Sequence, residues 1–459
     1  MSYKLEKEAF VSNLTGSSSI ETCGLLLIGI ACNVLWVNMT ARNILPKGNL
    51  GFLVEFFIFC LIPLFVIYVS SKVGVFTLCI ASFLPSFVLH VISPINWDVL
   101  RRKPGCCLTK KNENTFDRRI AGVTFYRSQM MLVTVTCILA VDFTLFPRRY
   151  AKVETWGTSL MDLGVGSFMF SSGTVAGRKN DIKKPNAFKN VLWNSFILLI
   201  LGFARMFLTK SINYQEHVSE YGMHWNFFFT LGFMALGVFF FRRSLKKVSY
   251  FNLATFITLL HHCLLVLTPF QKWALSAPRT NILAQNREGI ASLPGYIAIY
   301  FYGMYTGSVV LADRPLMYTR AESWKRFQRL LFPLCILLVL YLVSNFLSVG
   351  VSRRLANTPY VANVAFINMF FLTIYILIDA YLFPSSVPYG SRVPKLLEDA
   401  NNNGLLVFLI ANVLTGVVNL SFDTLHSSNA KGLTIMTMYL FIICYMAHWL
   451  AQHGIRFRL

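Results

Sequence analysis

The sequence predicts an all-α fold: a polytopic transmembrane helical bundle of about thirteen spans with no soluble domain. Hydrophobic residues make up 55% of the 459 residues and charged residues only 14%, which is more apolar material than a soluble domain of this size needs. Many apolar runs reach the roughly 20 residues that an α-helix needs to cross a bilayer. We therefore expect one integral-membrane domain over residues 1–459, in which residues 1–21 form a short polar tail.

Windows of high hydropathy place thirteen spans along the chain, joined by short connections. The predicted spans are residues 22–40, 51–70, 73–93, 123–146, 156–175, 190–209, 223–241, 250–269, 290–311, 330–348, 361–383, 404–422 and 431–450. No recurring block indicates a soluble repeat array, and no inverted repeat is apparent.

The basic residues of the connections predict how the chain crosses the membrane. The connections on one side hold 27 Lys and Arg residues, and those on the other side hold 13. Because positively charged loops stay in the cytoplasm, we expect the richer set to be cytoplasmic. The N-terminus is then lumenal and the C-terminus cytoplasmic.

Composition and motifs exclude several classes of protein. A net charge of +22 would indicate a nucleic-acid partner in a soluble protein, but basic cytoplasmic loops explain it better here. The ten cysteines show no spacing typical of metal ligands, so we expect no metal site. Walker A loops, dinucleotide fingerprints and GxSxG elbows are absent, which excludes soluble-type NTPases, dehydrogenases and hydrolases.

The stretch 138–162 carries the most unusual charges of the chain. Asp142 lies near the end of the fourth predicted span, Lys152 begins the fifth, and Asp162 is buried within the fifth. A charge at membrane depth is costly and marks a candidate functional site. A carboxylate in a partly dry site can act as a general base, and a nearby lysine can keep it ionised or stabilise an oxyanion. The alternative is a structural ion pair that closes a helical hairpin.

Four arginines are candidate anion ligands. Arg148 and Arg149 suit a lipid phosphate, and the alternative is that they anchor the chain at the membrane interface. Arg127 and Arg205 lie within predicted spans. Each of them pairs either with a buried acid of the bundle or with a phosphate or carboxylate of a ligand.

Two further predicted spans carry polar side chains. His261 and His262 lie in the eighth, where a histidine can be the base of a membrane-bound O-acyltransferase, although a hydrogen-bonded bundle histidine is commoner. Asn412 shares one helix face of the twelfth span with Thr415 and Asn419. Such amides commonly join helices, and substrate contact is the alternative.

Several blocks of the sequence together resemble one known family. They are Thr124–Arg127, Leu139–Phe143, Phe146–Arg149, Ala151–Gly166, Tyr214–His217, Glu220–Gly222, His224–Asn226, Asn286–Gly289 and Ser352–Arg354. These blocks are similar to those of the GPI-anchored wall transfer protein family, the fungal counterparts of the animal PIG-W-type inositol acyltransferases. The resemblance covers essentially the whole chain.

The resemblance implies an acyl transfer in the endoplasmic reticulum membrane. A fatty acyl group, usually palmitoyl, would move from acyl-CoA to the inositol 2-hydroxyl of glucosaminyl-phosphatidylinositol, an early step of GPI-anchor biosynthesis. Acyl-CoA is a co-substrate, so no cofactor is expected. The implied partners are these two substrates and membrane lipid, with no nucleic acid, and no protein partner can be deduced.

The family's catalytic pair falls on Asp142 and Lys152. Asp142 would take the proton of the inositol hydroxyl, and Lys152 would hold Asp142 charged or stabilise the oxyanion. The residues expected to bind substrate are Arg148, Arg149, Arg127, Arg205, Glu220, His224, Trp225, Asn226, Asn286, Arg287 and Asn412. Two rivals stay open: a lipid transporter or flippase, and a His-dependent membrane-bound O-acyltransferase.

Overall fold

A computed structural model describes residues 3–92, 119–178, 187–211, 218–245, 247–311, 320–347, 350–383, 387 and 389–456. These residues contain helices and turns and no strand, which confirms the all-α prediction. The chain divides into two compact units, and each is described by itself. Unit 1 holds Met1–Ser17, Lys152–Asp313 and Arg329–Phe370, and unit 2 holds Ser18–Ala151, Arg314–Gln328 and Phe371–Leu459. The single domain over residues 1–459 stays a prediction.

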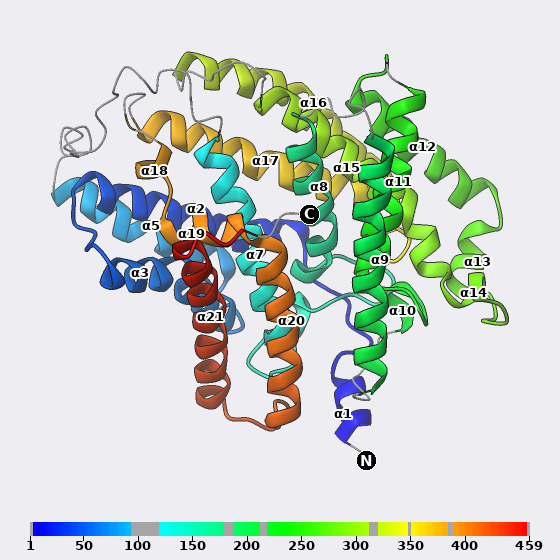
Figure 1. Cartoon of the computed structure of the whole chain (residues 1–459), viewed down its shortest axis with the longest axis horizontal. Helices are drawn as coiled ribbons and strands as arrows, with labels where there is room; N and C mark the ends of the chain where they lie inside the picture. The colour runs from blue at the N-terminus through cyan, green and yellow to red at the C-terminus, as the bar shows by residue number, and fades with distance from the viewer. Residues whose placement is uncertain are drawn as a thin grey trace. The chain divides into compact units, whose positions relative to one another are not determined.

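The helices of unit 1 come from the three stretches of the chain that make up this unit (Figure 1). They are α1 (Tyr3–Phe10), α8 (Leu160–Ala176), α9 (Ala187–Ser211), α10 (Val218–Tyr221), α11 (Phe227–Ser244), α12 (Tyr250–Leu267), α13 (Phe270–Ser276), α14 (Ile282–Gln285) and α15 (Arg287–Val310), with parts of α16 (Arg320–Leu347) and α17 (Thr358–Leu382).

Unit 2 contains the remaining helices. They are α2 (Ser19–Ala41), α3 (Asn49–Phe56), α4 (Ile62–Val69), α5 (Val75–Ile92), α7 (Ala121–Ala140), α18 (Tyr389–Arg392), α19 (Lys395–Asn402), α20 (Gly404–Ser421) and α21 (Asn429–Gln452), with the other parts of α16 and α17. A π-helical turn, Phe57–Leu61, joins α3 to α4. It lies just before Pro63, which has no N–H to donate to the preceding turn.

Eleven helices in the described part of the chain are long and apolar enough to cross a membrane. They coincide with eleven of the thirteen predicted spans, although α7 ends at Ala140, before the predicted end at residue 146. The other two predicted spans are α8, which is short at 17 residues, and α15, which is rich in tyrosine and glycine. The chain is therefore a polytopic, all-helical membrane protein.

In unit 1, α8 and α15 pack with their backbones in contact. A Cβ added to Gly173 would overlap the carbonyl oxygen of Tyr300, and one added to Gly303 would overlap that of Phe170. Gly177 and Gly307 repeat this arrangement one turn further along each helix. Each helix thus presents glycines four residues apart, the pattern that lets helices approach closely in a membrane.

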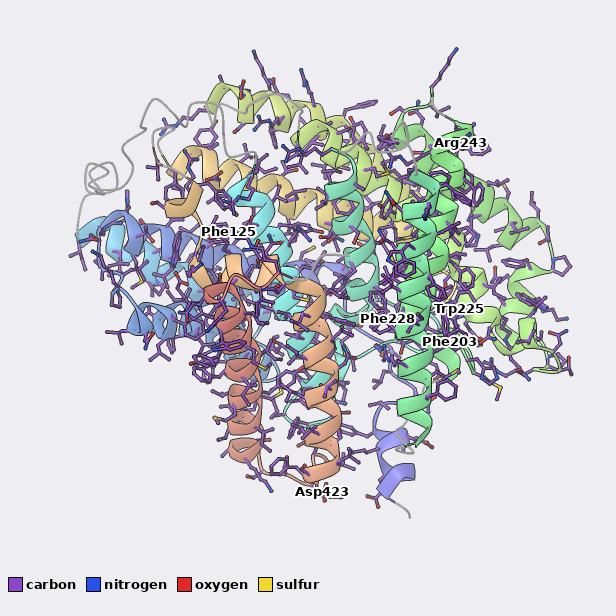
Figure 2. The ribbon with its side chains drawn as sticks, viewed as in Figure 1. Phe125, Phe203, Trp225, Phe228, Arg243 and Asp423 are labelled. Atoms are coloured by element: carbon purple, nitrogen blue, oxygen red, sulfur yellow. The ribbon has the colours of Figure 1, made fainter. Side chains whose placement is uncertain are left out.

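In unit 2, Phe125 of α7, which is labelled in Figure 2, packs against several aromatic rings. Its ring stacks on Tyr375 of α17 at 6.1 Å and meets the ring edge of Trp36 of α2 at 6.1 Å. Large buried rings contribute strongly to core packing. Nearby, α20 and α21 lie side by side as a hairpin (Figure 1).

Candidate active site

In unit 1 the polar connections gather at one end of the helices. The Gly157 amide donates to the Val351 carbonyl at 2.8 Å, and the Met223 amide donates to the Gln285 carbonyl at 2.9 Å. These two bonds join the connections that precede α8, α11, α15 and α17. The sequence predicts that all of these connections lie on one side of the membrane, and the packing within unit 1 agrees with that grouping.

Four charged residues form a chain at this end, here called the Asp162 cluster: Lys152, Glu220, Arg353 and Asp162. The Lys152 ammonium lies 2.7 Å from Glu220 Oε2, and Arg353 Nη1 lies 3.1 Å from Glu220 Oε1. Arg353 Nε lies 2.8 Å from Asp162 Oδ1. Positive and negative groups therefore alternate from the half-exposed Lys152 to the fully buried Asp162.

Hydrogen bonds to its side chain and to its main-chain carbonyl fix Asp162 in position. It lies in the first turn of α8, where Ser159 caps the helix and donates its hydroxyl to Asp162 Oδ2 at 2.7 Å. The Val153 amide donates to the same oxygen, and Tyr360 donates its hydroxyl to the Asp162 carbonyl. A buried carboxylate with this many partners is fixed in position and orients Arg353 in turn.

Arg353 is the central cation of the Asp162 cluster and is almost fully buried. Burial alone would lower its pKa, but Glu220 and Asp162 raise the pKa of the guanidinium well above its usual value. Arg353 therefore stays charged, and removing either carboxylate would leave it poorly compensated.

A second cluster of charges, here called the Glu288 cluster, surrounds the first turn of α15. Glu288 is completely buried, and Arg279 contacts it through two nitrogens, at 2.6 and 3.2 Å. Arg354 Nη2 lies 2.7 Å and Arg287 Nε 3.3 Å from Glu288 Oε1. Three guanidinium groups thus share one carboxylate.

The predicted block His224–Asn226 connects the helices of unit 1. The His224 amide donates to Asn286 Oδ1 at 2.9 Å. Trp225 covers Gly289, where a Cβ would overlap the indole ring, and donates its indole N–H to Thr230. Substrate binding by these residues stays a prediction.

Asn226 caps the start of α11. Its side-chain oxygen accepts from the amides of Phe228 and Phe229, and its amide nitrogen donates to the Gly202 carbonyl of α9 at 2.8 Å. The residue therefore joins α11 to α9, and its role toward a substrate also stays a prediction.

In unit 2, Asp142 lies in the turn that follows α7. Its Oδ2 accepts a hydrogen bond of 2.7 Å from the amide of Asn419 at the end of α20. Thr424 donates to the Asn419 oxygen, which fixes the orientation of that amide. Asp142 is half-buried. Its carboxylate is therefore held in position at the C-terminal ends of α7 and α20 and is still partly accessible to a ligand.

Arg148 and Arg149 bind groups of unit 2. Arg148 donates to the carbonyls of Val141, Phe143 and Phe146, and so closes the turn that holds Asp142. Burial lowers the pKa of Arg148 to about 10, and Asp142 acts against this shift. Arg149 contacts Glu21 at 2.8 Å and the Ser70 carbonyl at 2.7 Å. Phosphate binding by either arginine stays a prediction.

Asp142 and Lys152 belong to different units, and each has a partner in its own unit. Lys152 was expected at the start of the fifth span, but α8 begins only at Leu160, and Lys152 lies in the connection before it. Its ammonium can donate three hydrogen bonds, and Glu220 accepts one of them.

The other predicted site residues lie within helices or outside the described residues. Arg127 is in α7 and Arg205 in α9. Asn412 donates to the Phe408 carbonyl of its own helix at 2.7 Å. His261 Nε2 bonds the Leu355 carbonyl at 3.0 Å, as expected for a bundle histidine. The block Tyr214–His217 lies outside the described residues.

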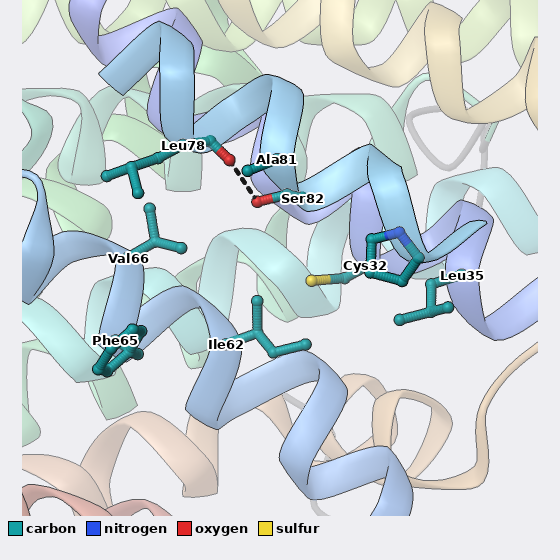
Figure 3. A pocket seen from close by; sticks show the side chains of 9 residues that line it. Cys32, Leu35, Ile62, Phe65, Val66, Leu78, Ala81 and Ser82 are labelled. Carbon is teal, nitrogen blue, oxygen red and sulfur yellow. Dashed lines mark hydrogen bonds between the residues drawn. The ribbon is translucent and has the colours of Figure 1, made fainter. Parts of the chain in front are cut away.

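An apolar cavity of about 240 Å³ opens among α2, α4 and α5 of unit 2 (Figure 3). Cys32, Phe65 and Pro85 are among its lining residues. Ser82 is the polar member, and its hydroxyl bonds the Leu78 carbonyl of its own helix at 2.7 Å. None of the predicted site residues lines this cavity, which suits hydrocarbon rather than a charged group.

The sequence did not single out several members of these clusters as site residues. Arg353, Arg354 and Glu288 lie in blocks that carry the family resemblance, and Asn419 lies on the polar face of α20 that it shares with Asn412 and Thr415. Arg279 had no signal at all, because an arginine in a connection between spans is unremarkable.

Fold and site together define a class: a polytopic helical membrane protein with ordered charged clusters at the ends of its helices. The sequence profile of the GWT1 family matches residues 3–450 of the chain. The GPI-anchored wall transfer protein 1 of Yarrowia lipolytica is 38% identical over 95% of both chains. That of Saccharomyces cerevisiae is 35% identical over 99% of both, and that of Emericella nidulans is 36% identical over 100% of this chain and 99% of its own. The chain belongs to the GWT1 family.

Proposed function

We propose that the chain is an acyl-CoA-dependent O-acyltransferase of GPI-anchor biosynthesis. It moves a fatty acyl group, such as palmitoyl, to the inositol 2-hydroxyl of glucosaminyl-phosphatidylinositol. Membership of the GWT1 family carries this proposal, because the match extends over residues 3–450. We place the protein in the endoplasmic reticulum membrane with its N-terminus in the lumen, as the loop charges predict.

In this proposal Asp142 is the general base. Its carboxylate takes the proton of the inositol 2-hydroxyl, and the oxygen attacks the carbonyl carbon of the thioester. The tetrahedral intermediate then expels the CoA thiolate, which recovers a proton from Asp142. Asn419 supports this role because it fixes one carboxylate oxygen at 2.7 Å and leaves Asp142 half-buried, where a carboxylate can act as a base.

Lys152 is proposed to stabilise the oxyanion of the tetrahedral intermediate. Its pairing with Glu220 supports the proposal, because a fixed ammonium needs no reorganisation when charge develops on the substrate. Arg353 holds the other oxygen of Glu220 and so fixes the partner of Lys152. Arg148 supports the base by closing the turn around Asp142.

The test is turnover of purified, detergent-solubilised protein with palmitoyl-CoA and a synthetic glucosaminyl-phosphatidylinositol. Turnover there excludes a transporter, since no second compartment exists. Asp142→Asn should lower kcat by about 10²–10⁴-fold, as expected for loss of a general base, and Lys152→Ala should lower it by about 10²–10³-fold. Normal acylation by both variants would overturn the assignment. Retained turnover in His261→Ala and His262→Ala would exclude the His-dependent class.

A further inference from the structure

The Glu288 cluster carries more positive charge than its own carboxylate compensates. Arg279, Arg287 and Arg354 contribute three positive charges, and Glu288 contributes one negative charge. Arg287 is only 7% exposed, and the Arg354 side chain is 11% exposed. Two uncompensated positive charges are therefore held largely out of water, a costly arrangement unless an anion joins them.

Two guanidinium nitrogens of this cluster also lack a hydrogen-bond partner. Arg287 Nη1 and Arg354 Nε are buried, and neither finds an acceptor among the described residues. Buried donors are nearly always satisfied. Two unsatisfied donors beside two excess charges indicate a missing anionic acceptor rather than a finished structural cluster.

The surroundings of the cluster favour an anion carried by a lipid. Arg287 is the first residue of α15, so the positive end of a 24-residue helix adds to the local potential. On the adjoining α14, Ile282 is 71% and Leu283 61% exposed. Exposed aliphatic side chains beside buried arginines are typical of the level at which lipid headgroups meet hydrocarbon.

We propose that the Glu288 cluster is a binding site for a phosphate group of an anionic lipid headgroup. The planar guanidinium fork matches phosphate oxygens in bidentate geometry. Arg287 and Arg354 supply the unsatisfied donors, and Arg279 adds charge at the rim. Glu288 holds the three guanidinium groups together and reduces their repulsion when the site is empty. Arg287 is among the residues expected to bind glucosaminyl-phosphatidylinositol, so this inference deepens the proposed function, but lipid binding can be measured without an acyl donor and fails independently of turnover.

The test measures binding to the purified full chain in zwitterionic detergent, by thermal stabilisation with phosphatidylinositol, phosphatidylcholine or inorganic phosphate. Arg279→Gln lowers the net charge of the cluster from +2 to +1 and should weaken phosphatidylinositol binding by about tenfold. Glu288→Gln raises the net charge to +3 and should strengthen binding several-fold. An opposite change in these two variants is the signature of an anion site.

The matched control is Arg243→Gln, which removes the same charge from an exposed position at the other end of α11 (Figure 2), and its binding should equal that of the wild type. Stabilisation by phosphatidylinositol alone identifies the lipid as the ligand, and stabilisation by inorganic phosphate as well identifies the phosphate group itself. Equal stabilisation by phosphatidylcholine and phosphatidylinositol would overturn the proposal. If Glu288→Gln does not fold, unchanged binding in Arg279→Gln alone overturns it.

Discussion

Arg353 and Arg354 are neighbours in the sequence, yet they enter two clusters of different charge balance. The Asp162 cluster holds two cations and two carboxylates in alternation, whereas the Glu288 cluster holds three cations around one carboxylate. The first set of charges sums to zero within the protein. The second requires an anion from outside. The difference teaches that the charge balance, more than the presence of a buried arginine, separates a group that positions its neighbours from one that binds a ligand.

The largest effect is expected from removing the central cation of the Asp162 cluster. Arg353→Met leaves Asp162 and Glu220 without their shared cation, so we expect a loss of about 3–5 kcal/mol in the free energy of unfolding. Thermal unfolding in detergent measures it. The control is Arg119→Gln, because Arg119 pairs with Glu398 at an exposed position and should contribute less than about 1 kcal/mol. Equal effects of the two variants would contradict the comparison.

A smaller effect is expected at Glu220, the member of the Asp162 cluster that contacts the proposed oxyanion-stabilising Lys152. Glu220→Gln keeps an oxygen acceptor for Lys152 but removes the charge that holds its ammonium. We expect kcat to fall about tenfold, or 1.4 kcal/mol, with little change in KM, because the ammonium is misplaced only for the developing oxyanion. Glu322→Gln, at a half-exposed carboxylate of α16, is the control and should leave both constants unchanged. A rise in KM with constant kcat would show that Glu220 serves binding instead.

The smallest effect is expected in the Glu288 cluster. Arg354→Met removes one of three like charges and leaves Glu288 with Arg279 and Arg287, so lower repulsion offsets the lost contact. We expect a cost of about 1 kcal/mol in unfolding free energy, well below that of Arg353→Met, although the two residues are adjacent. Unfolding curves of Arg354→Met and Arg353→Met, measured side by side at low salt, give the two free energies of unfolding. A loss as large as that of Arg353→Met would show that Arg354 is structural.

Much of the fold could be predicted from the sequence, because a membrane span is a local property of about 20 residues. Each of the thirteen apolar windows corresponds to a helix of the described residues, including α8 and α15, and the window 51–70 corresponds to α3 and α4 with the π-helical turn between them. The short helices α10, α13, α14, α18 and α19 were not predicted, since four to eight residues give no apolar window. The end of α7 was also set too late, because Leu145 and Phe146 are apolar but lie in the buried turn after the helix.

The site could be predicted only as far as the side of the membrane on which its charges gather. The sequence marked Asp162 as a buried acid without a role, and the structure gives it Arg353, which lies 191 positions away. Nothing local shows that Arg353 turns toward Asp162 while Arg354 turns toward Glu288. That choice is made by the packing of α8, α15 and α17, which no window of the sequence contains.

The interlocked glycines of α8 and α15 have a consequence for the order in which the protein is built. The chain makes α9, α11 and α12 after α8 and before α15, so α8 leaves the ribosome long before the helix whose backbone it contacts. Until α15 is made, α8 stays in the lipid or in the insertion machinery with its glycine face unpaired. The start of α8, with Asp162 in its first turn, therefore takes its final place only after α15 and the connection before α17, which carries Arg353, have been made.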